Sequence, residues 1–409
     1  MTSIQHSEQT SAPPAGPAAE DAAPAPPGPS TARLAGLDVA RALAVFGMYT
    51  VHIGPAPASG VGSWFRYVVE GRSSILFATL AGFSLMLIAG RREPKTGLAG
   101  RQAKARIAIR ALVLLAIGTA MTMVYGDVVI LAFYGVYFLL ALPLVKLSAT
   151  KLALIAAGLA LVTPQLAFLL KKVLSGSVQQ TINAYDPLEK LSNVGVLDLL
   201  LTGMYPTMTW MPFVIAGMAL ARLDLATGAV RKRVAALGAA LVVLGYGLSR
   251  LLGGADALKS MAGSGPPPGT DMSAKMDMST GPFGAQGPGS LLLAGPHSGT
   301  TFDIVGSLGV AILVIVGATA ALERIGLLRR LAVPIIAVGS MSLTCYVGHF
   351  VVQGAVGMHM GPTAAQSWLP LLWFVLGATV FATVWSRFFK RGPLEYLLNA
   401  ATKPAKYIR

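Results

Sequence analysis

Histidine is the side chain best matched to proton transfer near neutral pH. The chain has five histidines, and four lie in or beside strongly apolar segments: His52, His297, His349 and His359. A single histidine in such a place is typical of a hydrogen-bonded structural residue. Four of them together are more suggestive of a site for proton transfer than any one alone. Asp303, six residues after His297, could support that histidine, so the candidate catalytic residues are His52, His297, Asp303 and His349.

A second group of residues suits an anionic ligand. Arg106 and Arg110 are four residues apart, which places both guanidinium groups on one face of a helix. A guanidinium binds phosphate oxygens through two parallel hydrogen bonds, so the pair suits a phosphate-bearing ligand. On spacing alone, contact with lipid headgroups is the simpler interpretation.

One apolar segment carries three ionisable side chains: Asp38, Arg41 and His52. Arg41 and His52 are eleven residues apart, which is about 20° around a helix and roughly 16 Å along it. They therefore share a face, with Asp38 placed to pair with Arg41. Asp38 and Arg41 join the candidate ligand-binding residues, with a role as helix-end anchors as the alternative.

The composition of the chain indicates the class of protein in which these residues are held. Of 409 residues, 54% are hydrophobic and 12% are charged, against about 25% charged in soluble domains. Mean hydropathy is +0.65. So little charge cannot cover a water-exposed surface, which excludes an ordinary soluble protein. The single cysteine, Cys345, excludes an intramolecular disulfide framework and a multi-cysteine metal site.

The sequence predicts an all-α integral membrane protein with about ten transmembrane helices in one bundle. A span needs roughly 20 mostly apolar residues, and ten segments meet this criterion: 34–54, 73–90, 106–125, 128–145, 149–170, 205–222, 233–252, 303–322, 331–354 and 368–388. Residues 1–32 are expected to form a disordered tail, because their Ala, Pro, Ser and Gly cannot bury enough surface. The membrane domain covers 33–400, with a long extracytoplasmic loop at 253–300, and 401–409 form a C-terminal tail.

The charge distribution predicts an orientation. The chain has 32 Lys+Arg and 17 Asp+Glu, a net charge of +15. Ten spans place four basic clusters on one side: Arg91, Arg92, Lys95, Arg101 and Lys104; Arg222, Arg231, Lys232 and Arg233; Arg324, Arg329 and Arg330; Arg387, Lys390 and Arg391. The positive-inside rule makes that side cytoplasmic, together with both termini. The histidines then lie in the outer half. Nucleic-acid binding has little support, since no soluble basic domain is present.

Several blocks resemble transmembrane acyltransferases, above all the bacterial heparan-α-glucosaminide N-acetyltransferase-like family. The first is R-L-x-G-L-D-V-A-R-x-L-A-V-x-G-M-x-x-V-H from Arg33 to His52, which also resembles, more distantly, the first helix of the acyltransferase-three family. Later blocks follow in order: GRSSILFATLAGFSLML (71–87), GDVVILAFYGVYFLLALPL (126–144), LTGMYPTMTWMPFVIAGMALARLDL (201–225), PHSGTTFD (296–303), GSMSLTCYVGHF (339–350) and RGPLEYLL (391–398).

This resemblance implies an enzyme that takes an acyl group, most simply acetyl, from cytosolic acyl-CoA. The acceptor would be a hydroxyl or amine of an extracytoplasmic sugar, lipid or metabolite. His52 matches the first-helix histidine, Arg106 and Arg110 match a paired-arginine motif, and His349 falls where several relatives have a late-helix histidine. The implied partners are acyl-CoA, the acceptor and the lipids of the plasma membrane. No metal is implied, and a homodimer is left open.

Two alternatives remain at the level of sequence. A transporter or exporter without acyl chemistry is also consistent with ten spans and buried charges, although no internal repeat is visible. An outward copper-binding surface would use thioether and imidazole groups such as Met272, Met276, Met278 and Met358-His359-Met360.

Overall fold

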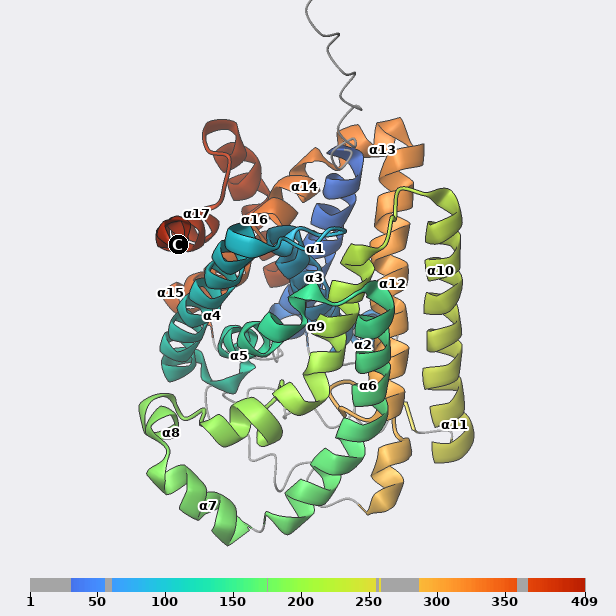
Figure 1. Ribbon diagram of the computed structural model, residues 1–409, viewed down its shortest axis with the longest axis vertical. Helices are drawn as coiled ribbons and strands as arrows, with labels where there is room; N and C mark the ends of the chain where they lie inside the picture. The colour runs from blue at the N-terminus through green and yellow to red at the C-terminus, as the bar shows by residue number, and fades with distance from the viewer. Residues whose placement is uncertain are drawn as a thin grey trace, which may run out of the picture.

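The computed structural model describes residues 31–55, 61–174, 176–254, 257–258, 287–358 and 367–408. Within these residues the chain is almost entirely helical (Figure 1). Residues 1–30 of the expected tail (1–32), most of the long loop at 253–300 and His359 lie outside the described residues, whereas Thr31 and Ala32 begin the first helix.

Each of the ten segments predicted as a span is helical. The main helices are α1 (Thr31–Ile53), α3 (Arg72–Ala89), α4 (Gly97–Tyr125), α5 (Leu131–Ala141), α6 (Ala149–Val173), α9 (Thr207–Arg222), α10 (Gly228–Val242) with α11 (Leu248–Gly253), α12 (Thr301–Arg324), α14 (Val333–Ser340) with α15 (Ser342–Ala355), and α16 (Leu369–Phe388). Five short helices flank or connect them: α2 (Val61–Val69), α7 (Gly176–Tyr185), α8 (Pro187–Ser192), α13 (Gly326–Leu331) and α17 (Pro393–Ala401).

Judged by length and composition, the described helices include fewer candidate membrane spans than the predicted ten. Six described helical segments are long and apolar enough to cross a membrane, and a seventh is obtained if α14 and α15 form one bent span. α1 is not among these segments, and two further helices are too short: α5 with the following 3-10 turn to Lys146, and α9 with 16 residues. The protein is a polytopic helical membrane protein, but the count of ten is not confirmed.

α9 is short because it lies in the centre of the bundle rather than against lipid. Nearly all of its residues are buried, and it packs on α3 and α6. α3 and α9 approach each other through two glycines. A Cβ on Gly82 would lie 1.9 Å from the carbonyl oxygen of Val214, and one on Gly217 would lie 1.8 Å from that of Thr79. Small residues allow helix backbones to pack this closely in membranes.

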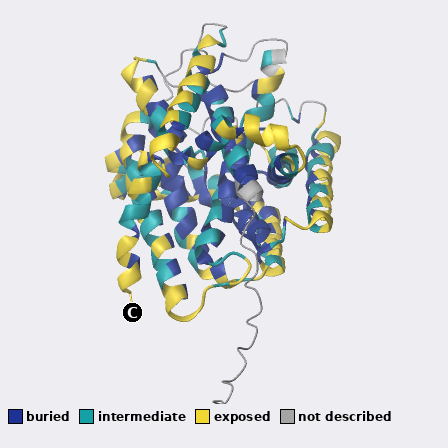
Figure 2. Cartoon of the chain, turned by 90° about the horizontal axis from the view of Figure 1, so that it is seen from above, coloured by how far each residue is buried: buried dark blue, intermediate teal, exposed yellow. Residues whose placement is uncertain are grey.

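The outer surface of the bundle is apolar, as contact with lipid requires. Figure 2 shows buried residues in the middle of the molecule and exposed residues on its outer faces. Large apolar side chains point outward on α6 and α16, including Leu154, Leu161 and Trp373, which are 67%, 60% and 63% exposed. An exposed apolar surface of this kind is typical of a membrane-embedded protein.

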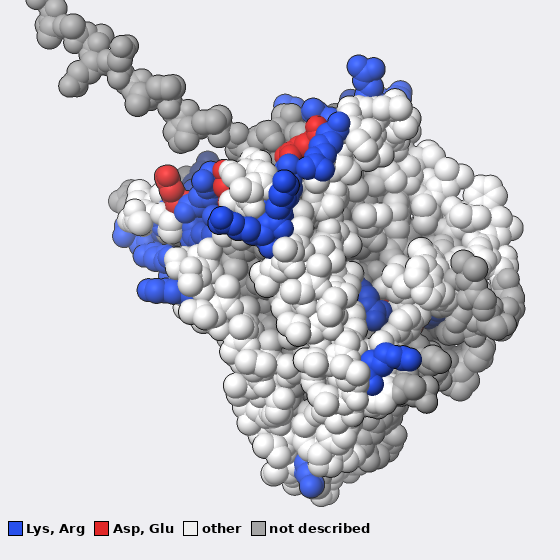
Figure 3. Space-filling view, turned by 90° about the vertical axis from the view of Figure 1, so that its right-hand side faces the viewer, with Lys and Arg blue, Asp and Glu red and all other residues white. Residues whose placement is uncertain are grey.

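The basic clusters lie together at one end of the bundle, which we call the basic end (Figure 3). Arg222, the last residue of α9, holds two other connections together there. It donates to the carbonyl oxygens of Val145 at 2.6 Å and Leu147 at 3.1 Å, both between α5 and α6, and to that of Arg91 between α3 and α4. Further ion pairs at this end join Arg92 to Asp224 at 3.5 Å and Arg231 to Glu323. The loops that the charge pattern assigned to one side are therefore neighbours in space.

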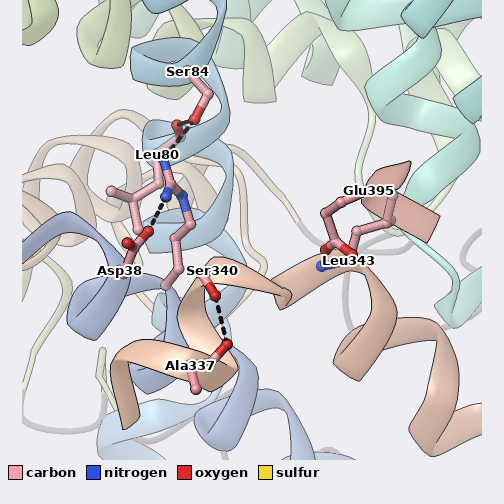
Figure 4. A network of polar contacts seen from close by, with 8 residues as sticks. Asp38, Leu80, Ser84, Ala337, Ser340, Leu343 and Glu395 are labelled. Atoms are coloured by element: carbon pink, nitrogen blue, oxygen red, sulfur yellow. Dashed lines mark hydrogen bonds and ion pairs between the residues drawn. The ribbon is translucent and has the colours of Figure 1, made fainter. Parts of the chain in front are cut away.

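The segment predicted as one span at 331–354 is instead broken. α14 and α15 meet at an angle of 83° around Met341. The first backbone N–H groups of α15 have no helical partner, and the Glu395 carboxylate accepts from two of them, Leu343 at 2.8 Å and Thr344 at 3.1 Å. Figure 4 shows Glu395 next to Leu343 at this helix start, and Ser340 hydrogen-bonded to Ala337 within α14. The cap lies 52 residues from Leu343 and 51 from Thr344 in sequence, so local pattern could not predict the break.

The glycine contact between α3 and α9 gives a stability prediction. Gly82→Ala places a methyl group against the Val214 carbonyl and should lower the apparent melting temperature in detergent, with a cost of about 1–3 kcal/mol. Gly317→Ala on α12 is the matched control, since its Cβ meets nothing within 4 Å. It should be neutral or stabilising by about 0.5–1 kcal/mol. Equal shifts in the two variants would contradict close packing at Gly82.

Candidate functional site

Two of the predicted histidines are in direct contact. Nδ1 of His52 on α1 lies 2.8 Å from Nε2 of His349 on α15, and the two rings are nearly parallel with centroids 5.1 Å apart. Both side chains are buried, with 6% and 2% of their surface exposed. The other ring nitrogen of His349, Nδ1, is hydrogen-bonded to the backbone carbonyl of Tyr346. We call His52 and His349 the histidine pair.

Packing between α1 and α15 positions the pair. The Tyr49 hydroxyl on α1 donates to the carbonyl of Cys345 on α15 at 2.7 Å, one helical turn before His349. Tyr49 and Phe350 also cover the His349 ring, with centroids 4.8 Å and 4.1 Å away. α14 approaches α1 equally closely, because a Cβ on Gly339 would overlap the Asp38 carbonyl. The broken helix therefore brings His349 to the first helix.

His297 lies in the same region but belongs to a different environment. Its backbone has a positive φ of 60°, and its ring packs against Tyr205 and Trp210 at centroid distances of 5.5 Å and 5.9 Å. It lies within electrostatic range of His52. Its Nδ1 is buried and has no hydrogen-bond partner among the described residues.

The structure does not bring the Asp303 carboxylate into a hydrogen bond with His297. One oxygen of Asp303 accepts from the Gly299 backbone N–H at 3.2 Å, and the other accepts from the Ser307 hydroxyl at 2.9 Å. Asp303 stands in the first turn of α12, where a carboxylate stabilises the helix start. These contacts favour a structural role for Asp303. Its closeness to His297 in the sequence had instead predicted that it would support that histidine.

Arg66 is a candidate that the sequence interpretation missed. Its side chain is 6% exposed, and its Nη1 donates to the Thr50 carbonyl at 3.1 Å, two residues before His52. Its Nε is buried without a hydrogen-bond partner among the described residues, and its charge acts on His52. The available signal was an arginine inside a long apolar stretch, since Trp64–Ala89 qualifies as one span. Intramembrane charges are costly and usually functional.

The predicted ligand-binding arginines fall into two groups. Arg41 forms the expected ion pair with Asp38 and also donates to the Ser84 hydroxyl at 3.0 Å, which ties α1 to α3. Figure 4 shows Asp38 and Ser84 at this junction. Arg106 and Arg110 form no ion pair within the described part of the chain. Arg110 lies within electrostatic range of Arg106 and Arg391, and its Nε is buried without a hydrogen-bond partner in the part of the chain that the structure describes.

Arg106, Arg110 and Arg391 bring three positive charges together with no ion pair among the described residues, which makes them a candidate anion site. Their charges disfavour one another, so a bound phosphate would relieve repulsion and fill unused donors. Glu395, the nearest acid in the α17 sequence, is bound instead to the N-terminus of α15. Among the described residues no group of three His, Cys, Asp or Glu side chains could hold a metal ion. The Met272–Met278 and Met360 groups considered for copper lie outside the described residues.

The fold and the site define a polytopic helical membrane protein with a buried histidine pair and, at its basic end, a separate cluster of three arginines that is a candidate anion site. The family described as "Heparan-alpha-glucosaminide N-acetyltransferase, catalytic" matches residues 33–247, and the family described as "Protein of unknown function (DUF418)" matches residues 288–404. No curated protein matches the chain significantly. The first match covers more than half of the chain, so the chain belongs to the heparan-alpha-glucosaminide N-acetyltransferase catalytic family. It is an acetyltransferase-like membrane protein, as the sequence blocks indicated.

The surroundings of His297 give a pH prediction. Burial against neutral aromatic rings lowers the pKa of His297 from 6.5 to about 4. Between these values the unfolded chain binds a proton that the folded chain does not, so His297 makes stability fall as pH falls from 6.5 towards 4. The melting temperature should therefore fall by more between pH 7 and pH 5 in the wild type than in His297→Gln. The same drop in both proteins would show that His297 titrates normally.

Proposed function

We propose that the protein is an acyltransferase that moves an acyl group, most simply acetyl, from acyl-CoA to a hydroxyl or amine. The donor binds at the basic end from the cytoplasm, and the acceptor is an extracytoplasmic sugar, lipid or metabolite at the histidine pair. In this proposal the protein lies in the plasma membrane with both termini in the cytoplasm, because the basic clusters share one end. Residues 33–400 form the catalytic membrane domain, with tails at 1–32 and 401–409.

The observation that carries the proposal is the buried histidine pair. A structural histidine in an apolar core is satisfied by a single backbone contact, whereas here two imidazoles contact each other beside the Arg66 guanidinium. One of the two histidines lies on α1, within the match to the acetyltransferase family. A neutral imidazole is the general base that activates hydroxyl and amine nucleophiles at neutral pH.

His52 would act as the general base. It removes the proton from the acceptor hydroxyl or amine as that atom attacks the thioester carbonyl of acyl-CoA. The carbon–sulfur bond then breaks, and the proton passes from His52 to the departing CoA sulfur. The products are the acylated acceptor and free CoA thiol. The partnerless Nε–H of Arg66 suits the negative charge that develops on the carbonyl oxygen. Direct attack is favoured over an acyl-histidine intermediate.

The donor would be held by its phosphates. Arg106 and Arg110 are the proposed contacts, with Arg391 beside them. Arg41 and Asp38 are paired on α1, the helix that carries His52, and Arg41 is tied to α3, so their proposed role is to line the path of the pantetheine arm. His297, with its partnerless Nδ1, is the proposed second contact for the acceptor. Asp303 holds the loop that carries His297.

Comparing cells with and without the protein tests the reaction. Mass spectrometry of envelope glycans, lipids and secreted metabolites should show an acyl mass on one component only when the protein is made. His52→Ala should remove this mass and lower turnover by about 10²–10⁴-fold, because the general base is lost. His6→Ala, in the N-terminal segment, is the control and should keep the mass. Flux of an unmodified molecule without acyl-CoA consumption would instead support a transporter.

The anion site gives a separate prediction. Arg110→Gln should raise the KM for acetyl-CoA by about tenfold with little change in kcat, since a charge-assisted hydrogen bond to phosphate contributes about 1.5–3 kcal/mol. Arg233→Gln removes the same charge from an exposed position at the basic end. It should leave the KM unchanged. A similar rise in both variants would mean that the basic end attracts the donor only by its overall field.

A further inference from the structure

A chain of two hydrogen bonds leads from a backbone carbonyl to His52. Nδ1 of His349 is bonded to the carbonyl of Tyr346, and Nε2 of His349 is bonded to Nδ1 of His52. We propose that His349 is a positioning residue that fixes the tautomer of His52. This inference rests on the proposed function, because it defines which nitrogen of His52 acts as the base.

The positions of the protons follow from the chain of contacts. A carbonyl oxygen can only accept, so Nδ1 of His349 carries a proton. A neutral imidazole has one protonated nitrogen, so Nε2 of His349 is an acceptor. Nδ1 of His52 must then be the donor in the 2.8 Å contact, which leaves Nε2 of His52 with a free lone pair. This is the nitrogen that would take the proton from the acceptor.

The surroundings of His349 allow few other arrangements. The ring is 2% exposed, and aromatic rings of Tyr49, Tyr346 and Phe350 lie within 5.4 Å of its centroid. The Tyr346 carbonyl belongs to the same helix as His349, one turn earlier, so the acceptor and the ring move together. α15 in turn is held to α1 by the Tyr49 hydroxyl bond to the Cys345 carbonyl.

The arrangement also serves the step in which His52 is protonated. Once Nε2 takes the proton, the cation on His52 faces the lone pair of His349 through the Nδ1–H bond. The Tyr346 carbonyl dipole stabilises positive charge on His349 in the same way. In the serine-hydrolase triad a buried carboxylate stabilises the protonated histidine. Here a second neutral imidazole does so, and no buried negative charge is required.

Nitrogen NMR of histidine-labelled protein in lipid bilayers tests the tautomer without any substrate. Five histidines give few signals, and each is assigned by its loss in the matching His→Gln variant. In the wild type, His52 and His349 should both be protonated at Nδ1 and unprotonated at Nε2. In His349→Phe, which keeps an aromatic ring and removes the acceptor, the His52 proton should move to Nε2, the tautomer that free histidine favours. The His297 signal is the internal control and should not move.

Kinetics with acetyl-CoA give the second readout. His349→Phe should lower kcat on the order of 10²-fold with an unchanged KM for acetyl-CoA, since His52 then carries the wrong tautomer. His349→Gln places an amide oxygen near the position of Nε2 and should recover most of the activity. If His349→Phe does not fold, His349→Gln and the wild-type NMR still test the proposal.

The inference is overturned if His52 is protonated at Nε2 in the folded wild type, or if folded His349→Phe keeps the wild-type tautomer and kcat. Failure of the proposed function would differ from this result. In that case the wild type would show the Nδ1–H tautomers but no CoA release from acetyl-CoA in the presence of envelope extract.

Discussion

In an apolar surrounding, backbone groups that leave a helix must find partners within the chain, and the junction of α14 and α15 is where this requirement shapes the molecule most. The bend of 83° frees the first N–H groups of α15. The Glu395 carboxylate binds two of them and also accepts from the Thr344 hydroxyl at 2.5 Å. A buried donor left without a partner costs about 1–3 kcal/mol. The C-terminal helix α17 is therefore part of what allows the broken helix to exist.

The histidine pair depends on that break. α14 packs against α1 at Gly339, and α15 leaves the junction in a new direction that carries His349 to His52. A straight helix over the same residues would continue along the line of α14 and carry His349 elsewhere. The contact thus joins two residues that are 297 positions apart in the sequence. One residue comes from each of the two matched family regions. Neither region contains the pair by itself.

Sequence patterns predicted the helices well and the contacts poorly. Apolar length located all ten helical segments, and charge located the basic end, because both depend on local composition. The Asp38–Arg41 pair also followed from spacing of three residues. The break at Met341 was missed because its cap, Glu395, is remote in sequence. His52 and His349 were each selected by residue type, but their 2.8 Å contact depends on helix packing, which no periodicity encodes. Arg66 was overlooked although it lies within a long apolar stretch, and its contact with the Thr50 carbonyl depends on helix packing.

The arginines show how partners separate structure from chemistry. Arg222 uses all of its guanidinium nitrogens on backbone carbonyls, and Arg41 uses its own on Asp38 and Ser84. These contacts hold neighbouring segments of the bundle together. Arg66 and Arg110 each keep a buried Nε without a partner in the part of the chain that the structure describes. A buried donor without a partner carries a desolvation cost, and under the proposed function a transient anion would offset this cost at both places. One place lies beside the histidine pair and the other at the basic end, where the proposed transfer would need positive charge at the thioester oxygen and at the phosphates of the donor.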